Sequence, residues 1–387
     1  MNFILDLIKS SVNTLLFCLV FSSFILFGCD STDHYSNENP TIIDLSTIQK
    51  SVTNERIIRI NKIIPLETDE SCTIGTIDKI LINNNRLILV DIRKTLSVFF
   101  FDLDGKFIRK ISTIGTGEKE FLAIRDFIKK SNNDGYYLYD KRLHKLLEYD
   151  NELNYINEYH VPISINSLIE FHEMSFIVER SVNEFFINQC DFSFNIFNKY
   201  LKRPDYLLNY NFNIPFPLKK TGKNTLNYSP TFSNTIYEYK DKTFTKKYLL
   251  KDKKGFPDQG FFESNRGVHP GRILPKFQKE NFLSFLDYYE NDQLLLLKYY
   301  KGKNQIITFF DKKRTQTVSY KSTHDNIVSI ILNNVLAIDL QGCFISYLYP
   351  YQLSEMDKMR LYDNFINKNS KINDQDNPLI VFFEVKL

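Results

Sequence analysis

The stretch IGTIDKILINNNRLILVDIRKTLSVFFFDLDGKFIRKIS, residues 74–112, contains four short apolar runs separated by turn residues. The runs are residues 77–82, 86–90, 96–101 and 107–111, and they are rich in the β-branched and aromatic residues that favour strands. Asp102-Leu103-Asp104-Gly105, between the last two runs, is typical of a tight hairpin turn, because glycine adopts a positive φ without steric cost. Four consecutive antiparallel strands in about 35 residues predict a β-meander.

The same order of strands and turns recurs in residues 121–162, with strands expected at 126–129, 136–139, 145–149 and 155–160. Asp91 and Asp140 both end a second strand, 49 residues apart, and Asp102 and Asp150 both end a third strand, 48 residues apart. Four strands in each unit of 40 to 50 residues are the signature of a β-propeller blade.

Later segments keep this rhythm less regularly. Strands are expected within residues 174–200, 234–250, 293–320, 333–350 and 377–387. Glu55 to Leu387 spans 333 residues, or six units of about 55, so the predicted fold is an all-β, six-bladed propeller of four-stranded antiparallel blades. We expect Ile57–Ile64 to pair beside Leu379–Val385 and close the ring, and Ser354–Asn369 to form a helix inserted in the last blade.

The chain begins with the pattern of a secretory signal peptide. Val12–Phe27 is almost entirely apolar but spans about 16 residues, fewer than the roughly 20 of a membrane-spanning helix. Leu26-Phe27-Gly28-Cys29 resembles the lipobox of bacterial lipoproteins, in which the cysteine receives acyl chains such as palmitate and the chain is cut before it. Phe27 departs from the usual small residue, and an uncleaved anchor or a buried helix is the alternative.

These observations predict three parts: a signal peptide at 1–28, a lipidated Cys29 with a flexible tether at 29–54, and a propeller domain at 55–387. Asp30–Pro40 is rich in serine, aspartate and asparagine, a composition that does not pack into a core. Two or three acyl chains anchor a protein stably. We therefore expect the protein in the cell envelope, lipid-anchored to the outer membrane and facing the periplasm or the cell surface.

Charge and cysteine content exclude several classes of protein. The 49 basic and 46 acidic residues leave a net charge of +3 without a clustered basic run, so we expect no nucleic-acid partner. After the signal peptide and Cys29, three cysteines remain, at 72, 190 and 343. An odd and widely spaced set predicts neither a disulfide framework nor a zinc site, so we expect small buried residues within strands.

The repeat also carries a family resemblance. Asp91, the Phe101-Asp102 pair with Gly105, and the loop Gly115-x-Gly117-x-x-Glu120-Phe121 resemble the blades of NHL-like six-bladed β-propeller lipoproteins of Gram-negative gut bacteria. The resemblance covers most of residues 55–387. It implies the same propeller fold, but the activity of that family is mostly unknown.

No pattern in the sequence assigns a catalytic residue, a cofactor or a metal. GTGEKEF, residues 115–121, lacks the lysine and hydroxyl residue of a phosphate-binding loop, and we interpret it as an inter-blade loop in which Glu120 caps backbone amides. Asp102-Leu103-Asp104-Gly105 lacks the twelfth-position acid of a calcium loop, since that residue is Thr113. The six histidines, at 34, 144, 160, 172, 269 and 324, fall irregularly against the blade period. His269 lies between Arg266 and Arg272, and we interpret it as a solvated loop residue.

Aromatic loops indicate a binding surface instead. Residues 209–220 and 347–356 place tyrosine, phenylalanine and proline outside the expected strands, where they either bind a partner or fold back over the blades. The function that the sequence predicts is therefore binding of a partner protein, peptide or glycan through one propeller face. The competing classes are a lyase or hydrolase with a metal-dependent site in the central channel, and a sensor or scaffold in an envelope complex.

Overall fold

The computed structural model describes residues 39–48, 57–171, 175–180, 183–208, 210, 214–222, 224–323, 326–365 and 372–387. The chain separates into two units, Met1–His34 and Tyr35–Leu387, and every described residue belongs to the second unit. The predicted signal peptide and Cys29 lie outside the described residues.

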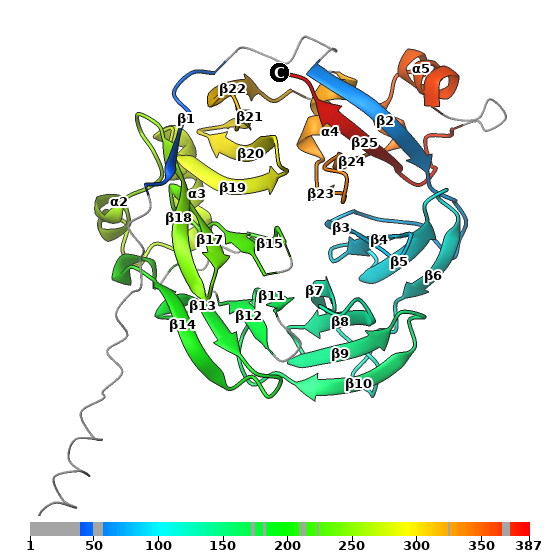
Figure 1. Ribbon diagram of the computed structural model, residues 1–387, viewed down its shortest axis with the longest axis horizontal. Helices are drawn as coiled ribbons and strands as arrows, with labels where there is room; N and C mark the ends of the chain where they lie inside the picture. The colour runs from blue at the N-terminus through cyan, green and yellow to red at the C-terminus, as the bar shows by residue number, and fades with distance from the viewer. Residues whose placement is uncertain are drawn as a thin grey trace, which may run out of the picture. The chain divides into compact units, whose positions relative to one another are not determined.

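Six β-sheets form a ring around one axis, which confirms the predicted six-bladed propeller (Figure 1). Blade 1 contains β3 (Lys79–Asn83), β4 (Arg86–Asp91), β5 (Ser97–Asp102) and β6 (Phe107–Ile111). Blade 2 contains β7 (Ile124–Lys129), β8 (Gly135–Asp140), β9 (Lys145–Asp150) and β10 (Tyr155–His160). Blade 3 contains β11 (Ser167–Glu170), β12 (Phe176–Glu179), β13 (Phe185–Cys190) and β14 (Ile196–Lys202).

Blade 4 contains β15 (Leu218–Lys220), β16 (Leu226–Tyr228), β17 (Thr235–Lys240) and β18 (Thr243–Lys251). Blade 5 contains β19 (Leu283–Glu290), β20 (Leu294–Lys301), β21 (Asn304–Asp311) and β22 (Gln316–Lys321). Blade 6 contains β23 (Ala337–Ile338), β24 (Phe344–Leu348), β25 (Leu379–Val385) and β2 (Ile58–Pro65). The first strand of each blade in this order lies next to the axis (Figure 1).

Buried aspartates explain the recurrence in blades 1 and 2. Asp91 is fully buried, and its carboxylate accepts hydrogen bonds from five backbone amides, those of Gly75, Thr76, Arg93, Lys94 and Thr95. Asp140 accepts in the same way from the amides of Leu122, Arg142 and Leu143. Each aspartate therefore joins the loop that enters its blade to the turn that follows the second strand.

Gly105 meets two requirements of the blade 1 hairpin. Its φ is +87°, and the Asp102 carboxylate accepts from the amides of Asp104 at 2.9 Å and Lys106 at 2.8 Å, which confirms the predicted turn. A Cβ at Gly105 would lie 2.1 Å from the carbonyl oxygen of Pro65, at the end of β2. Only glycine therefore lets this turn approach the neighbouring blade so closely.

The two ends of the propeller domain meet in blade 6, as predicted. Strands β2 and β25 pair antiparallel, with Ile58 opposite Val385 and Pro65 opposite Leu379. Strand β2 precedes blade 1 in the chain, and β25 is the last strand of the chain. Their pairing therefore closes the ring between blade 6 and blade 1.

One blade departs from the four-stranded prediction. Strand β1 (Thr41–Asp44) adds to the outer edge of blade 4, parallel to β18, with Thr41 opposite Tyr248 and Asp44 opposite Lys251. Ile43 and the following Leu45 are buried against blades 4 and 5. Residues 41–44, within the segment expected to be a flexible tether, are therefore part of the sheet, because two apolar side chains and a free strand edge are enough to hold them.

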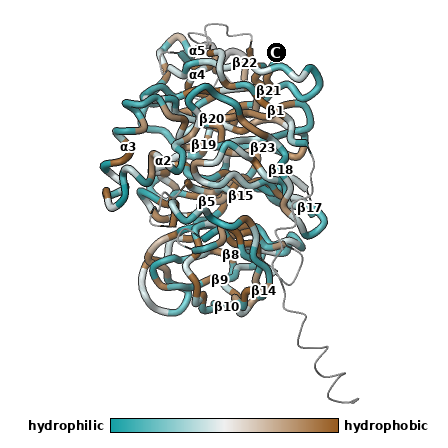
Figure 2. The backbone as a smooth tube through the Cα atoms, turned by 90° about the vertical axis from the view of Figure 1, so that its left-hand side faces the viewer, coloured by the Kyte–Doolittle hydropathy of each residue, from teal (hydrophilic) through white to brown (hydrophobic). Residues whose placement is uncertain are grey.

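The helices of the described residues lie in connections at the end of the ring where the axial strands begin. Helices α2 (Gln259–Ser264) and α3 (Pro270–Lys279) connect β18 to β19, and α4 (Ile327–Asn333) connects β22 to β23. Helix α5 (Glu355–Phe365) confirms the insertion expected in blade 6, and residues 366–371 lie outside the described part. Figure 2 shows α3, α4 and α5 on one side of the ring. Within the described residues, none of the helices has the length and apolar character needed to cross a membrane.

Candidate functional site

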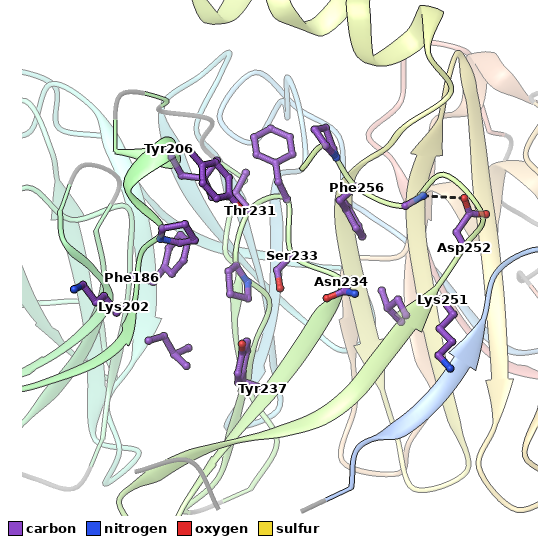
Figure 3. Close-up of a pocket in the computed structure, with 18 residues that line it drawn as sticks. Phe186, Lys202, Tyr206, Thr231, Ser233, Asn234, Tyr237, Lys251, Asp252 and Phe256 are labelled. Carbon is purple, nitrogen blue, oxygen red and sulfur yellow. Dashed lines mark hydrogen bonds between the residues drawn. The ribbon is translucent and has the colours of Figure 1, made fainter. Parts of the chain in front are cut away.

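A cleft of about 430 Å³ lies between blades 3 and 4 (Figure 3). Aromatic side chains line it from separate parts of the chain: Phe186, Tyr206, Phe232, Tyr237 and Phe256. A pocket of this volume suits a small ligand or a few side chains of a larger one. Figure 3 shows Phe186 and Lys202 on one side of the cleft and Asn234 and Lys251 on the other.

Contacts with neighbouring side chains hold two of these rings in place. The guanidinium carbon of Arg203 lies 4.1 Å from the centre of the Phe186 ring. Tyr206, in the 3-10 helix η2 (Asp205–Leu207), stacks on Phe262 of α2 with ring centres 5.7 Å apart. The aromatic wall is therefore held by contacts that do not require a ligand.

The polar side of the cleft is built from tight turns. The Ser233 hydroxyl accepts from the amide of Thr235 at 3.1 Å, and the carbonyl of Asn234 accepts from the amide of Leu250 at 2.7 Å. Asp252 accepts from the amide of Gly255 and pairs with Lys301. Burial opposes the charge of Asp252, but Lys301 and the backbone amides hold the pKa of its carboxyl below the ordinary value.

A second hollow, of about 500 Å³, lies where blade 6 meets blade 1. Its lining includes Glu67, Asp104, Lys106 and Asp376 but no aromatic side chain. The cleft between blades 3 and 4 is therefore the better candidate for recognition of an apolar or ring-containing group.

Several charged side chains on the axial strands form ion pairs. Lys79 Nζ lies 2.7 Å from Asp126 Oδ1, and Asp287 lies 3.1 Å from Lys219 and 3.4 Å from Lys298. Burial opposes ionisation of Asp287, but the two lysines keep the pKa of its carboxyl below the ordinary value. Within the described part of the chain, no group of three or more histidine, cysteine, aspartate or glutamate side chains could hold a metal ion.

The histidines occupy separate places. His269 is exposed and caps α3, since its Nδ1 accepts from the amide of Gly271 at 3.1 Å. His144 Nδ1 lies 3.2 Å from the carbonyl oxygen of Val161, and His160 is exposed at the end of β10. His34, His172 and His324 lie outside the described residues.

The three remaining cysteines are free and buried, as predicted. Cys190 ends β13, whereas Cys72 lies in a turn and Cys343 directly precedes β24. Burial raises the pKa of the Cys190 thiol to about 12, so it stays protonated at neutral pH. Cys29, the predicted lipidation residue, is outside the described part of the chain.

The predicted loops behave differently from one another. Glu120 caps the amide of Gly117 at 2.8 Å between blades 1 and 2, as expected. In the 209–220 loop, Tyr210 and Phe216 are buried, so the described aromatic residues fold back over the blades. In the 347–356 loop, Tyr351 and Met356 are exposed, so this loop presents apolar groups to solvent.

Comparison with known proteins gives a family for this chain. The model of the family described as a domain of unknown function, DUF4934, matches residues 40–384. This span begins one residue before β1 and ends within β25. The chain belongs to the DUF4934 family. The match to the family model begins directly before β1, which agrees with the inclusion of this strand in the fold.

Solved structures support the fold of this DUF4934 chain. A protein from Bacteroides fragilis NCTC 9343 that is named as an exported protein is 18% identical, with a TM-score of 0.75, over 90% of this chain and 100% of that one. A member of the DUF4221 family from Bacteroides vulgatus ATCC 8482 is 9% identical, with a TM-score of 0.53, over 86% of this chain and 99% of that one. No curated protein sequence matches the chain significantly. At these identities the similarity concerns the fold.

Proposed function

We propose that this protein is a lipid-anchored envelope protein that binds a partner protein, peptide or glycan through the cleft between blades 3 and 4. The observation that supports this function is the lining of the cleft, in which aromatic rings such as Tyr206 and Phe256 face hydroxyl and amide groups such as Ser233 and Asn234. Aromatic rings contribute a large contact area and stack on sugar rings or on peptide side chains, while the polar groups set orientation.

The proposed anchor would hold the propeller close to a membrane. Eleven residues separate Cys29 from Thr41, the first residue of β1. A fully extended chain of this length spans at most about 40 Å. Because β1 is fixed to the outer edge of blade 4, the lipid would tether the propeller through that blade. We interpret the sequence as that of an NHL-like lipoprotein of the outer membrane.

The anchor is tested by replacing Cys29 with serine, which removes the thiol that receives lipid. We expect Cys29→Ser to move the full-length protein from the membrane fraction to the soluble fraction, and mass analysis of the wild-type protein to find a mature N-terminus at an acylated Cys29. Cys18→Ser is the matched control and should stay with the membrane. An unmodified Cys29 still joined to Gly28 would contradict the proposal.

The cleft is tested by removing its rings. We expect Tyr206→Ala and Phe256→Ala each to weaken binding of the full-length protein to its ligands on glycan and peptide arrays by about 10-fold, because a buried aromatic contact contributes about 1–2 kcal/mol. The control is Phe197→Ala, which removes an exposed ring from β14 outside the cleft. Equal signals from the cleft variants and Phe197→Ala would rule out this cleft as the binding site.

A further inference from the structure

Cationic side chains gather beside the axis where blades 2 and 3 meet. Arg125 is the second residue of β7, Lys141 directly follows β8, and Asn166 directly precedes β11. Adjacent antiparallel strands begin and end at the same edge of a sheet, so all three residues lie at the end of the ring where the axial strands begin. The helices α2, α3, α4 and α5 lie in connections at this same end.

Asn166 holds two of these cations together. Its backbone carbonyl accepts a hydrogen bond from Arg125 Nε at 2.8 Å, and its side-chain oxygen accepts from Lys141 Nζ at 3.1 Å. Asn166 itself is buried and is neutral. Two like charges are therefore placed on one residue that does not neutralise either of them.

The surrounding carboxylates do not balance this charge. Asp126, next to Arg125, is already paired with Lys79 at 2.7 Å. Arg203 donates to the backbone carbonyls of Asn183 and Arg180 rather than to an acid. Among the described residues, neither Arg125, Lys141 nor Arg203 has a carboxylate within ion-pair distance, although all three interact electrostatically with Glu179 and Arg125 also interacts with Asp126.

The directions of two pKa shifts agree with an excess of positive charge. Burial, and then the nearby charge of Arg125, lower the pKa of Lys141. Burial also raises the pKa of the Glu179 carboxyl, which weakens its ability to neutralise the cations. In addition, Arg125 Nη2 is buried and has no hydrogen-bond partner among the described residues. A charged donor without a partner is costly to bury, so Arg125 is poorly satisfied by the protein itself. An oxyanion beside the partly exposed Arg125 and Lys141 side chains would offset the excess positive charge.

We propose that Arg125 and Lys141, held together by Asn166, form a binding site for a small oxyanion such as a phosphate, sulfate or carboxylate group. Both side chains are partly exposed, so the guanidinium and the ammonium would each supply a positive charge and an N–H donor to such a group. This site is separate from the aromatic cleft between blades 3 and 4, so the proposal does not depend on the function assigned to that cleft.

The test measures binding of inorganic phosphate, sulfate and acetate to the full-length protein by calorimetry and thermal unfolding, against sodium chloride at the same ionic strength. We expect at least one oxyanion to bind and raise the melting temperature, because a ligand that binds the native state stabilises it. Lys141→Gln should weaken that binding at least 10-fold. This variant should fold normally, since it removes a cation that Arg125 repels.

Lys110→Gln is the matched control, because it removes one exposed lysine from the outer strand β6. It should bind the oxyanion as the wild type does. Arg125→Gln should behave like Lys141→Gln, and if it does not fold, Lys141→Gln alone decides. Equal affinity in the wild type and Lys141→Gln would overturn the proposal, as would failure of all three oxyanions to bind the wild type.

Discussion

Asp91→Ala should destabilise the protein by about 4 kcal/mol, because it removes the buried acceptor of five partly buried backbone amides, at up to about 1–3 kcal/mol each. The Asp91 carboxylate is fully buried and accepts from five amides and from the hydroxyls of Thr76 and Thr95. Urea unfolding of the wild type and the variant measures the difference in the free energy of unfolding.

The same residue makes stability depend on pH. Burial opposes ionisation of Asp91, but the hydrogen bonds outweigh it and lower the pKa of the carboxyl. The folded-state pKa is thus below the unfolded value of about 3.9, so the stabilisation is present above that value and is lost as the pH falls through the folded pKa. The wild-type advantage over Asp91→Asn should therefore shrink in acid.

Asp102→Ala is the control, since Asp102 also caps blade 1 amides but does so at the partly exposed hairpin. Water can replace its hydrogen bonds, so the loss in the free energy of unfolding should be much smaller for Asp102→Ala than for Asp91→Ala. Equal losses for Asp91→Ala and Asp102→Ala would mean that burial of the acceptor is unimportant in this blade.

The features that the sequence predicted well are those that each blade needs for local reasons. Asp91 and Asp140 recur because each must bind the amides of two turns, and Gly105 is required by its positive φ and by the nearby Pro65 carbonyl. Closure by Ile57–Ile64 and Leu379–Val385 was predictable because both segments are strand-like and lie at the two ends of the repeat. Interactions between residues that are close in the sequence therefore leave a pattern that can be recognised in the sequence.

Features that depend on distant contacts left no such pattern. Strand β1 has only four residues, and Ile43 and Leu45 gain their burial from blades 4 and 5, about 200 or more residues later. Helix α3 has Gly271 in its first turn and Pro275 in its interior, and both residue types disfavour a helix. Tertiary packing of Ile273 and Phe277 decides its conformation instead.

The two candidate sites were hidden for the same reason. The cleft combines Phe186, Tyr206, Tyr237 and Phe256 from different strands and connections of blades 3 and 4. The oxyanion site combines Arg125 and Lys141 with Asn166. These three residues come together only because blades 2 and 3 pack against each other. In a propeller, residues of one site come from different blades and are far apart in the sequence. A local sequence motif therefore does not reveal them.

Phe383→Ala should reduce the free energy of unfolding by about 3–5 kcal/mol, the usual cost of removing a fully buried ring. Phe383 lies in β25 between Ile60 of β2 and Phe344 of β24, and its ring stacks on Phe344 with centres 5.7 Å apart. The side chain is fully buried. Because this strand closes the ring, the cavity should weaken the contact between the two ends of the domain and not only one sheet.

Hydrogen exchange separates these two effects. Phe383→Ala should speed exchange of the β2 amides more than that of the blade 3 amides, since β2 is held in the ring mainly by its pairing with β25. Phe197→Ala, which removes a ring that is 54% exposed, should change stability by less than about 0.5 kcal/mol and leave β2 unaffected. If β2 stayed as protected as in the wild type while overall stability fell, Phe383 would act as an ordinary core residue, and closure of the ring would rest on the backbone pairing of β2 and β25 alone.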